Sequence, residues 1–489
     1  MRISGVLLVL LSFPVLAASP ADVDALIGAA RSAPPEFSAD ALIRIAGVEQ
    51  LDKNRRIELL AQAFERASSA QQPFKRHAAP LRSDGSPGYW NRVYSQDLDA
   101  LSLRLRAVEA MLPLDQTKAR ELFVRIPVPA TPALQCEDFL VYDVARFYNV
   151  LGALAKRLSS QEGGGAQAYE LLARYAGALT APVQAAPLAR VLASAPVTDA
   201  DFHKLVDSYK AALARVTGDD RSFSYSTRVG REMQGLVEEC KRRKVSPLPL
   251  LEAYRVYLVI NLSSKRCADD DLMVAGQVTF GAFATQPTQD ASDDFVGFFN
   301  DKLRMPPLQP IQELEATPAR LEGAATGLRV CEDEECRSIA KAIQGLVLGP
   351  NGSPYLPAER EKPEWQANFK SVVGSIVAWK QTKDTSPSEY FREKSAAYFN
   401  LVNLSPAGSN RETVLHGLLD FVKGNGFQNA SRMEWFLPVN ALIGRTGLDP
   451  LGLGKFAEEL RQASDPVIAL YAKLEAMAPR SPDAILGLL

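Results

Sequence analysis

Apolar residues recur at steps of three and four along most of the chain, and this spacing restricts the fold more than any other feature. The clearest stripes are Leu98, Leu101, Leu105, Val108 and Leu112; Leu140, Val144, Phe147, Leu151 and Leu154; Phe369, Val372, Ile376 and Trp379; and Val467, Tyr471, Leu474 and Met477. Because an α-helix turns once in about 3.6 residues, this spacing gives each helix a single apolar face. Strand-like alternation is weak, and its best example, residues 272–283, is interrupted by two glycines. The pattern predicts an all-α fold.

A capping residue followed directly by proline marks seven further helix starts. These pairs are Ser19-Pro20, Thr131-Pro132, Ser246-Pro247, Thr317-Pro318, Asp449-Pro450, Asp465-Pro466 and Ser481-Pro482. The side-chain oxygen can accept a backbone N–H that has no partner within the helix, and a proline in the first turn loses no needed donor. Several pairs lead into apolar stripes, which favours helices over isolated turns.

The predicted helices follow one another with short connections. We expect helices over residues 24–30, 39–47, 53–68, 97–112, 117–126 and 139–158, and an antiparallel pair over 229–244 and 247–262. Each helix pair must bury its apolar stripe against the next pair, as in an α-solenoid. The sequence therefore predicts an irregular helix-hairpin array that resembles an α-solenoid.

One stretch carries a resemblance to a known repeat. The run DALSLRLRAVEAMLPLDQTKARELFVRI begins at Asp99, and residues 99–125 within it are similar to a degenerate tetratricopeptide-type helical hairpin. The resemblance implies an architecture and carries no characterised activity.

Changes in composition divide the chain. Residues 285–327 are rich in Pro, Asp, Gln and Thr, and residues 348–363 are rich in Gly and Pro, which is typical of loops. We expect a signal peptide at 1–18, a helical repeat-like region at 19–283, a linker and irregular region with short helices at 284–363, and a C-terminal helical bundle at 364–489.

The first residues have the layout of a secretory signal peptide. Arg2 is followed by an apolar run over residues 6–16 and then by Ala17, Ala18 and Ser19. The run is too short for a membrane span, which needs about 20 apolar residues. We expect cleavage after Ala17 or Ala18, a secreted or periplasmic location, and no membrane span in the mature chain.

If the chain is exported, its five cysteines lie in an oxidising compartment. They are Cys136, Cys240, Cys267, Cys331 and Cys336. An odd number allows at most two internal disulfides. The segment from Cys331 to Cys336 also holds four acidic residues, but no second cysteine pair or nearby histidine could close a zinc site. A disulfide is favoured there, and we expect no metal and no cofactor. If residues 229–244 and 247–262 pair as antiparallel helices, Cys240 and Cys267 are too far apart to bond to each other.

Charge excludes one class of partner. Lys and Arg together number 55 against 57 for Asp and Glu, so no overall positive field attracts nucleic acid. The basic run from Lys241 to Lys244 follows Glu238 and Glu239, and its spacing predicts a solvated helix end with ion pairs.

Residues 73–94 hold the densest group of binding side chains. Its candidate binding residues are Arg76, His77, Arg82, Trp90, Arg92 and Tyr94. Guanidinium groups recognise carboxylates or phosphates, and exposed aromatic rings stack on sugars or bases. The alternative is a basic surface loop whose aromatic residues pack into a neighbouring helix groove.

Catalytic motifs are not found. The sequence has no Gly-x-Ser-x-Gly elbow, no His-Glu-x-x-His helix and no phosphate-binding Gly-Lys-Ser loop, and its three histidines are scattered. The leading hypothesis is a macromolecule-binding or scaffold module without catalytic activity, its partner another protein or an envelope polymer. The alternatives are an α/α-toroid enzyme acting on polysaccharide, as a lyase or glycosidase, and a purely structural envelope component.

Overall fold

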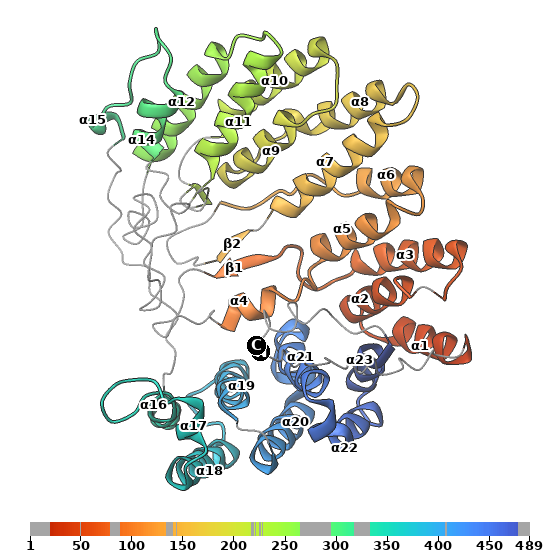
Figure 1. The fold of residues 1–489 in the computed structure, drawn as a ribbon, viewed down its shortest axis with the longest axis vertical. Helices are drawn as coiled ribbons and strands as arrows, with labels where there is room; N and C mark the ends of the chain where they lie inside the picture. The colour runs from red at the N-terminus through yellow and green to blue at the C-terminus, as the bar shows by residue number, and fades with distance from the viewer. Residues whose placement is uncertain are drawn as a thin grey trace, which may run out of the picture.

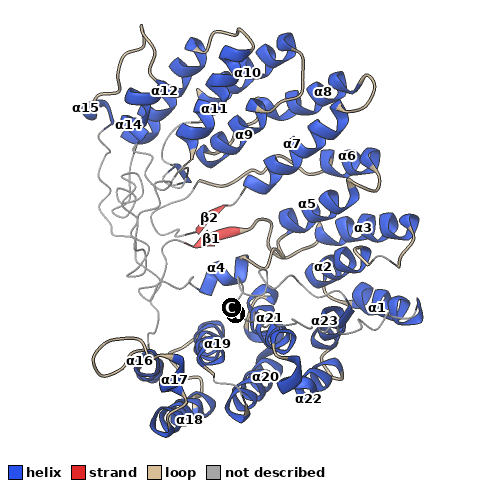
Figure 2. Cartoon of the chain, viewed as in Figure 1, coloured by secondary structure: helices blue, strands red, loops and turns tan. Residues whose placement is uncertain are grey.

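The computed structural model describes residues 20–48, 50–78, 89–133, 140–142, 144–216, 220, 222–223, 226, 228–264, 295–316, 333–405 and 408–477. Helices dominate this part of the chain (Figure 2), and the predicted all-α fold is confirmed. The predicted signal peptide at 1–18 and the strand-like stretch at 272–283 lie outside the described residues.

The N-terminal half forms neighbouring helices with short connections. Its helices are α1 (Pro20–Ser32), α2 (Pro35–Ala46), α3 (Lys53–Ala67), α4 (Tyr89–Tyr94), α5 (Ala100–Met111), α6 (Gln116–Val124), α7 (Ala145–Ser159), α8 (Gly164–Ala176), α9 (Ala185–Ala193), α10 (Asp199–Leu213), α11 (Val229–Arg242) and α12 (Leu248–Ser263). The strands β1 (Arg76–Ala78) and β2 (Leu140–Tyr142) pair antiparallel, with His77 opposite Val141.

The C-terminal half is also helical. Its helices are α14 (Phe295–Phe298), α15 (Glu313–Ala316), α16 (Glu334–Val347), α17 (Pro357–Arg360), α18 (Pro363–Ala378), α19 (Pro387–Leu404), α20 (Ser409–Asn429), α21 (Arg432–Leu448), α22 (Pro450–Arg461) and α23 (Pro466–Met477). α16 lies before the predicted bundle boundary at residue 364, yet it packs against α18 and α19.

Local capping explains where many of these helices begin. Asp52, Asp99 and Asp115 each accept a hydrogen bond from a backbone N–H in the first turn of α3, α5 and α6, at 2.8–3.0 Å. Three of the seven predicted capping pairs place their proline at the start of a helix (α1, α22 and α23), and Pro247 is the N-cap of α12. The pairs at 317–318 and 481–482 lie outside the described residues.

The helices follow an arc in which chain order and spatial order differ (Figure 1). From α12 the arc passes through α9, α7, α5 and α2, and it continues through α23, α22 and α20 to α18. The last helix among the described residues, α23, packs against α1 and α2, and α21 packs against α4. The C-terminal helices therefore extend the array beyond α1. One hydrophobic cluster runs from Val23 in α1 to Leu474 in α23.

The contact between α2 and the C-terminal helices, here called the junction, has an aromatic centre. The Phe37 ring is fully buried and lies next to the rings of Phe427, Trp435, Phe436 and Tyr471, at centroid distances of 4.6–6.3 Å. Aromatic pairs at such distances add stability beyond the apolar area that they bury.

Two buried carboxylates of α2 complete the junction. Asp40 accepts hydrogen bonds from the Arg106 guanidinium and from the Tyr471 hydroxyl, both at 2.6 Å. Glu36, with no exposed surface, pairs with Arg432 at 3.0 Å. Because a buried charge is costly unless it is paired, these residues tie α2 to one arrangement of α5, α21 and α23.

Three sequence expectations need correction. The helix predicted over 139–158 is shorter, because Leu140–Tyr142 pairs with β1 and α7 begins only at Ala145. The strand ladder satisfies backbone groups that a longer helix would have paired internally.

Thr131-Pro132 is not a helix start, since both residues lie in an extended connection. The carbonyl of nearby Pro129 accepts hydrogen bonds from the Gln184 amide at 2.6 Å and from the Thr180 hydroxyl at 3.1 Å. These contacts from another part of the chain hold the connection in place of a helical turn.

The helices predicted over 229–244 and 247–262 are confirmed as α11 and α12, but their predicted antiparallel pairing is wrong. α11 packs chiefly on α9, and α12 packs on α10. The buried stripe of α11, which includes Met233, Leu236 and Val237, faces an earlier helix and not its neighbour in sequence.

We expect Arg106→Ala to lower the free energy of unfolding by about 3 kcal/mol, because the Asp40 carboxylate, only 3% exposed, would lose its cation. Urea unfolding at pH 7 measures this. The control is Arg461→Ala, which breaks an exposed pair with Glu458 and should cost less than about 1 kcal/mol. Equal losses in the two variants would contradict the role of the buried pair. Adding Asp40→Asn to Arg106→Ala should restore part of the loss.

A second prediction concerns Asp99, the N-cap of α5, whose burial raises the pKa of its carboxyl from 3.8 to about 6. The unfolded chain then releases this proton at lower pH than the folded chain, so the stability contribution is lost as pH rises from about 4 to about 6. The free energy of unfolding therefore falls by about 3 kcal/mol over this pH range because of Asp99. Asp99→Asn retains a capping acceptor and should remove this part of the pH dependence.

Urea unfolding of the protein and of Asp99→Asn at pH 4.5 and pH 7 gives the comparison. The variant should gain stability relative to the unaltered protein at pH 7 and not at pH 4.5. Parallel changes in both proteins would show that Asp99 does not titrate in this range.

Candidate functional site

A groove of about 530 Å³ lies between α3 and α6 on the surface of the array. It is here called the α3–α6 groove. Its lining residues are Asn54, Ile57, Glu58, Ala61, Gln62 and Glu65 from α3, Lys118 and Leu122 from α6, and Arg125 at the C-cap of α6.

Helical spacing produces this groove. The α3 residues that line it fall at positions 54, 57, 58, 61, 62 and 65, which is one continuous face of a helix. The adjacent face of α3, with Leu59, Leu60, Ala63 and Phe64, is buried in the core. The core stripe therefore holds α3 in place, and the neighbouring stripe remains available at the surface.

The floor of the groove is apolar and partly accessible. Ile57 and Ala61 are half-buried, and Leu122 is 4% exposed. Ala61 has only a methyl side chain, so another chain can approach the α3 backbone closely at this position.

Carboxylates along the α3 edge already have cationic partners. Glu58 pairs with Arg55 at 3.0 Å and with Arg31 at 3.6 Å. Glu65 accepts two hydrogen bonds from Arg125, at 2.6 and 3.0 Å. Both side chains of the Glu65–Arg125 pair are more than half exposed, and such a pair contributes little to stability.

Arg104 of α5 lies near the end of the groove that holds Glu65 and Arg125. The guanidinium carbons of Arg104 and Arg125 lie 5.7 and 5.2 Å from the centroid of the buried Phe64 ring. Burial and the nearby positive charge of Arg125 lower the pKa of Arg104. Within the described residues, no acceptor lies within hydrogen-bond distance of the buried Arg104 Nε. The negative charge of Glu65 also acts on this guanidinium, but it affects the pKa less than the positive charge of Arg125 does. This end of the groove therefore carries more positive than negative charge.

The segment predicted to bind ligands has a different environment. Arg76 and His77 belong to β1 and Trp90 to α4, while Arg82 lies outside the described residues. Arg92 and Tyr94 are 7% and 4% exposed.

The burial of Arg92 and Tyr94 agrees with the alternative given for this segment, in which its aromatic residues pack into a neighbouring helix groove. α4 packs against β1 and α21, and its residues Arg92, Val93 and Tyr94 are buried. The Arg92 guanidinium carbon lies 5.7 Å from the centroid of the Phe399 ring.

One cysteine is free, which agrees with the odd number of cysteines. Cys240, named as a possible disulfide cysteine, is a free thiol in the core of α11, and burial raises its pKa to about 11. Cys336 is disulfide-bonded, while Cys136, Cys267 and Cys331 lie outside the described residues. The pairing of the cysteines stays a prediction.

Acidic residues next to Cys336 lie at the N-terminus of α16, where they cap the helix. Asp333 is the N-cap, and its carboxylate accepts the Cys336 backbone N–H at 2.6 Å. A shallow groove of about 740 Å³ there is lined by Asp333, Glu334, Glu335 and Asp384 with hydroxyl side chains. Negative charge at a helix N-terminus is favourable in itself, so helix capping accounts for these residues. Among the described residues, no group of three or more His, Cys, Asp or Glu is arranged to hold a metal ion.

The basic run at the end of α11 forms ion pairs, as predicted. Glu239 pairs with Arg242 and Arg243, both at 2.6 Å, and its pKa is lowered to about 2, chiefly by the hydrogen bond from Arg242. Glu238 pairs with Lys241 at 2.9 Å.

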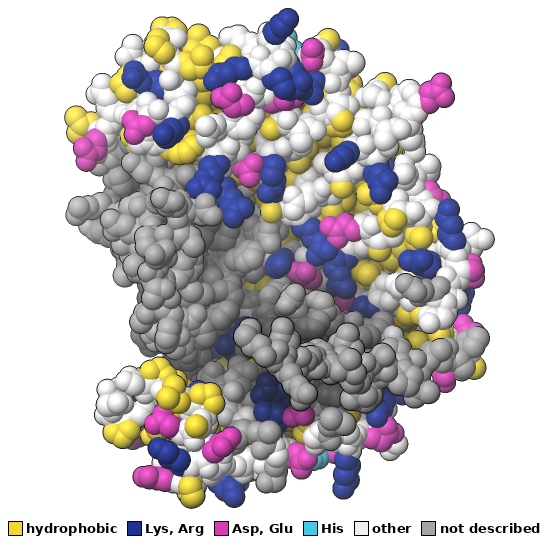
Figure 3. Space-filling view, viewed as in Figure 1, with side chains coloured by type: hydrophobic (Ala, Val, Ile, Leu, Met, Phe, Trp, Pro, Cys, Tyr) yellow, Lys and Arg dark blue, Asp and Glu magenta, His cyan; other side chains and the backbone are white. Residues whose placement is uncertain are grey.

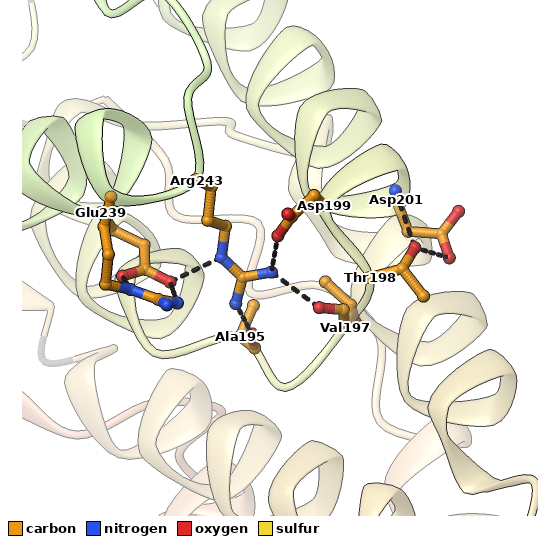
Figure 4. A network of polar contacts seen from close by, with 8 residues as sticks. Ala195, Val197, Thr198, Asp199, Asp201, Glu239 and Arg243 are labelled. Atoms are coloured by element: carbon orange, nitrogen blue, oxygen red, sulfur yellow. Dashed lines mark hydrogen bonds and ion pairs between the residues drawn. The ribbon is translucent and has the colours of Figure 1, made fainter.

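Arg243, only 8% exposed, also donates to the carbonyls of Ala195 and Val197 (Figure 4). It therefore joins the end of α11 to the connection after α9, which is a structural role.

Other positive side chains are more scattered. Lys and Arg side chains are spread across the face between α11 and α5, with Asp and Glu among them (Figure 3). Arg146 of α7 pairs with Asp97 at 3.1 Å and with Glu109 at 2.5 Å. No helix within the described ranges is long and apolar enough to cross a membrane.

Comparisons with known proteins do not identify a relative. No protein-family model matches the chain, and neither a curated protein nor a solved structure matches it. Function therefore has to be argued from the residues of this chain.

Sequence reasoning did not identify the α3–α6 groove. A signal was present in the second stripe of α3, where Ile57 and Ala61 continue the helical spacing beside the core stripe. Choosing that stripe requires knowing that α6 lies across from it, and this is a tertiary property.

A third prediction separates a binding role of Arg104 from a structural one. Arg104→Met retains an apolar stem and removes a charge that Arg125 repels, so the free energy of unfolding should stay within about 0.5 kcal/mol or rise. Phe64→Ala should lower it by about 3 kcal/mol or more. Urea unfolding at pH 7 checks both, and a large loss in Arg104→Met would assign this arginine to the scaffold.

Proposed function

We propose that this chain is an exported protein without catalytic activity, whose helical array binds another protein through the α3–α6 groove. The observation that carries this proposal is an apolar floor between two well-packed helices, next to an arginine whose buried Nε has no described hydrogen-bond acceptor.

The size of the groove indicates the kind of contact. A stable contact between two globular proteins buries about 800 Å² on each partner. A groove of about 530 Å³ is better suited to a single segment of chain, which gains affinity by inserting apolar side chains.

The position of the groove in the array supports the same function. α5 and α6 occupy the stretch whose sequence resembles a tetratricopeptide-type hairpin, with Asp99 and Arg125 as its two end caps. Stacked helices of this kind hold their surface residues at fixed spacings, so a bound segment meets a preformed surface.

Export is the second part of the proposal. The positive residue, apolar run and small residues at the start of the sequence support a secretory signal peptide. The partner would then be another exported protein.

The fourth prediction tests binding by photo-cross-linking in cells. A photoreactive amino acid at Asn54, an exposed residue that lines the groove, should capture a defined partner. Ala61→Arg should remove this cross-link, because the larger side chain fills the groove. Mass spectrometry identifies the captured protein.

The matched control is Ala153→Arg, which makes the same substitution at an exposed position of α7. It should leave the Asn54 cross-link unchanged. If Asn54 captures no protein, or if both arginine variants give the same cross-links as the unaltered chain, the groove is not a binding site.

A further inference from the structure

We infer that the α3–α6 groove takes an acidic amphipathic helix of a partner protein, whose carboxylate binds at Arg104 and Arg125. This inference rests on the proposed function and names the chemistry of the partner. It is argued from the length of the groove, the form of its floor and the balance of charge at one end.

The length of the groove sets the length of the segment. The α3 lining extends from Asn54 to Glu65, which at 1.5 Å per residue is about 17 Å. A helix of about three turns covers this distance.

The apolar floor of the groove favours a partner helix that has an apolar stripe. Ile57 and Ala61 are one turn apart on α3, and Leu122 faces them from α6. A bound helix with apolar side chains at positions i, i+3 or i+4, and i+7 would place them along this row. The small side chain of Ala61 allows close packing at the centre.

Charge selects an acidic partner over a basic one. Glu58 and Glu65 already pair with arginines of this chain. The buried Nε of Arg104 has no hydrogen-bond acceptor among the described residues. The positive charge of Arg125 lowers the pKa of Arg104 more than the negative charge of Glu65 raises it.

A carboxylate at this point would reduce the repulsion between the two guanidinium groups. A guanidinium has five N–H donors, and Arg125 uses two of its nitrogen atoms on Glu65. One incoming carboxylate can therefore accept from both arginines without displacing Glu65.

The fifth prediction uses a phage-displayed library of random 16-residue peptides, selected on the immobilised full chain. Enriched peptides should share apolar residues three or four apart and an Asp or Glu. A synthetic peptide of the consensus sequence is then titrated by fluorescence anisotropy near 0.15 M salt. Arg104→Met should weaken its binding about tenfold, the usual effect of losing a charge-assisted hydrogen bond.

A double-mutant cycle tests the contact itself. Replacing the acidic residue of the peptide by its amide should weaken binding to the unaltered chain about tenfold, and should have little further effect on Arg104→Met. Arg461→Met, which removes an exposed arginine of α22, is the matched control and should bind as the unaltered chain does.

Several outcomes would overturn the inference. Enriched peptides without an acidic residue, or acidic peptides that bind Arg104→Met and Ala61→Arg normally, would exclude the proposed contact. Displacement of the peptide by inorganic phosphate at equal concentration would indicate a simple anion site. In each case the Asn54 cross-link still tests the proposed function independently, because it does not depend on the charge of the partner.

Discussion

Buried carboxylates on α2 impose the arrangement on which the rest of the structure depends. Asp40 lies in the core, where Arg106 and Tyr471 donate hydrogen bonds to its carboxylate. These partners come from positions 66 and 431 residues away. Hydrophobic burial supplies most of the stability of such an array, but it is not directional. The paired charges make the packing of α2 specific, because another arrangement of this helix would leave its buried carboxylates without partners.

The junction also determines how the α3–α6 groove is supported. α2 packs on α3, α3 packs on α5, and α5 packs on α6, so each helix that forms the groove is connected to the junction. Arg106 and Arg104 lie on the same helix, and one binds the buried Asp40 while the other lies beside Arg125 and Phe64. A short helix thus contributes to both the core and the surface.

Charged side chains are paired differently in the junction and at the groove. In the junction, Arg44 pairs with Glu475 at 2.9 Å with both side chains largely buried, which favours a permanent contact. At the groove, the exposed Glu65–Arg125 pair costs little to rearrange, and the buried Nε of Arg104 has no described hydrogen-bond acceptor. Strong internal pairing suits a scaffold, whereas incompletely paired charge suits a surface that exchanges water for a ligand.

Local interactions made part of this structure predictable from the sequence. The helices over α3, α5, α6, α11 and α12 were predicted to within a few residues, because apolar spacing and capping residues act within one or two turns. Long-range pairing limited the rest. Leu140–Tyr142 became a strand because β1 was available as its partner, and the packing of α4 between β1 and α21 buried Arg92 and Tyr94.

The sequence alone therefore determined which segments are helical and which face of each helix is apolar. The tertiary structure decided which helix each face meets, and with it the position of the groove. The physical reason is that an apolar stripe packs well against many other stripes. Its actual partner depends on shape and on buried charges, such as Asp40 and Arg106, that come from distant parts of the chain.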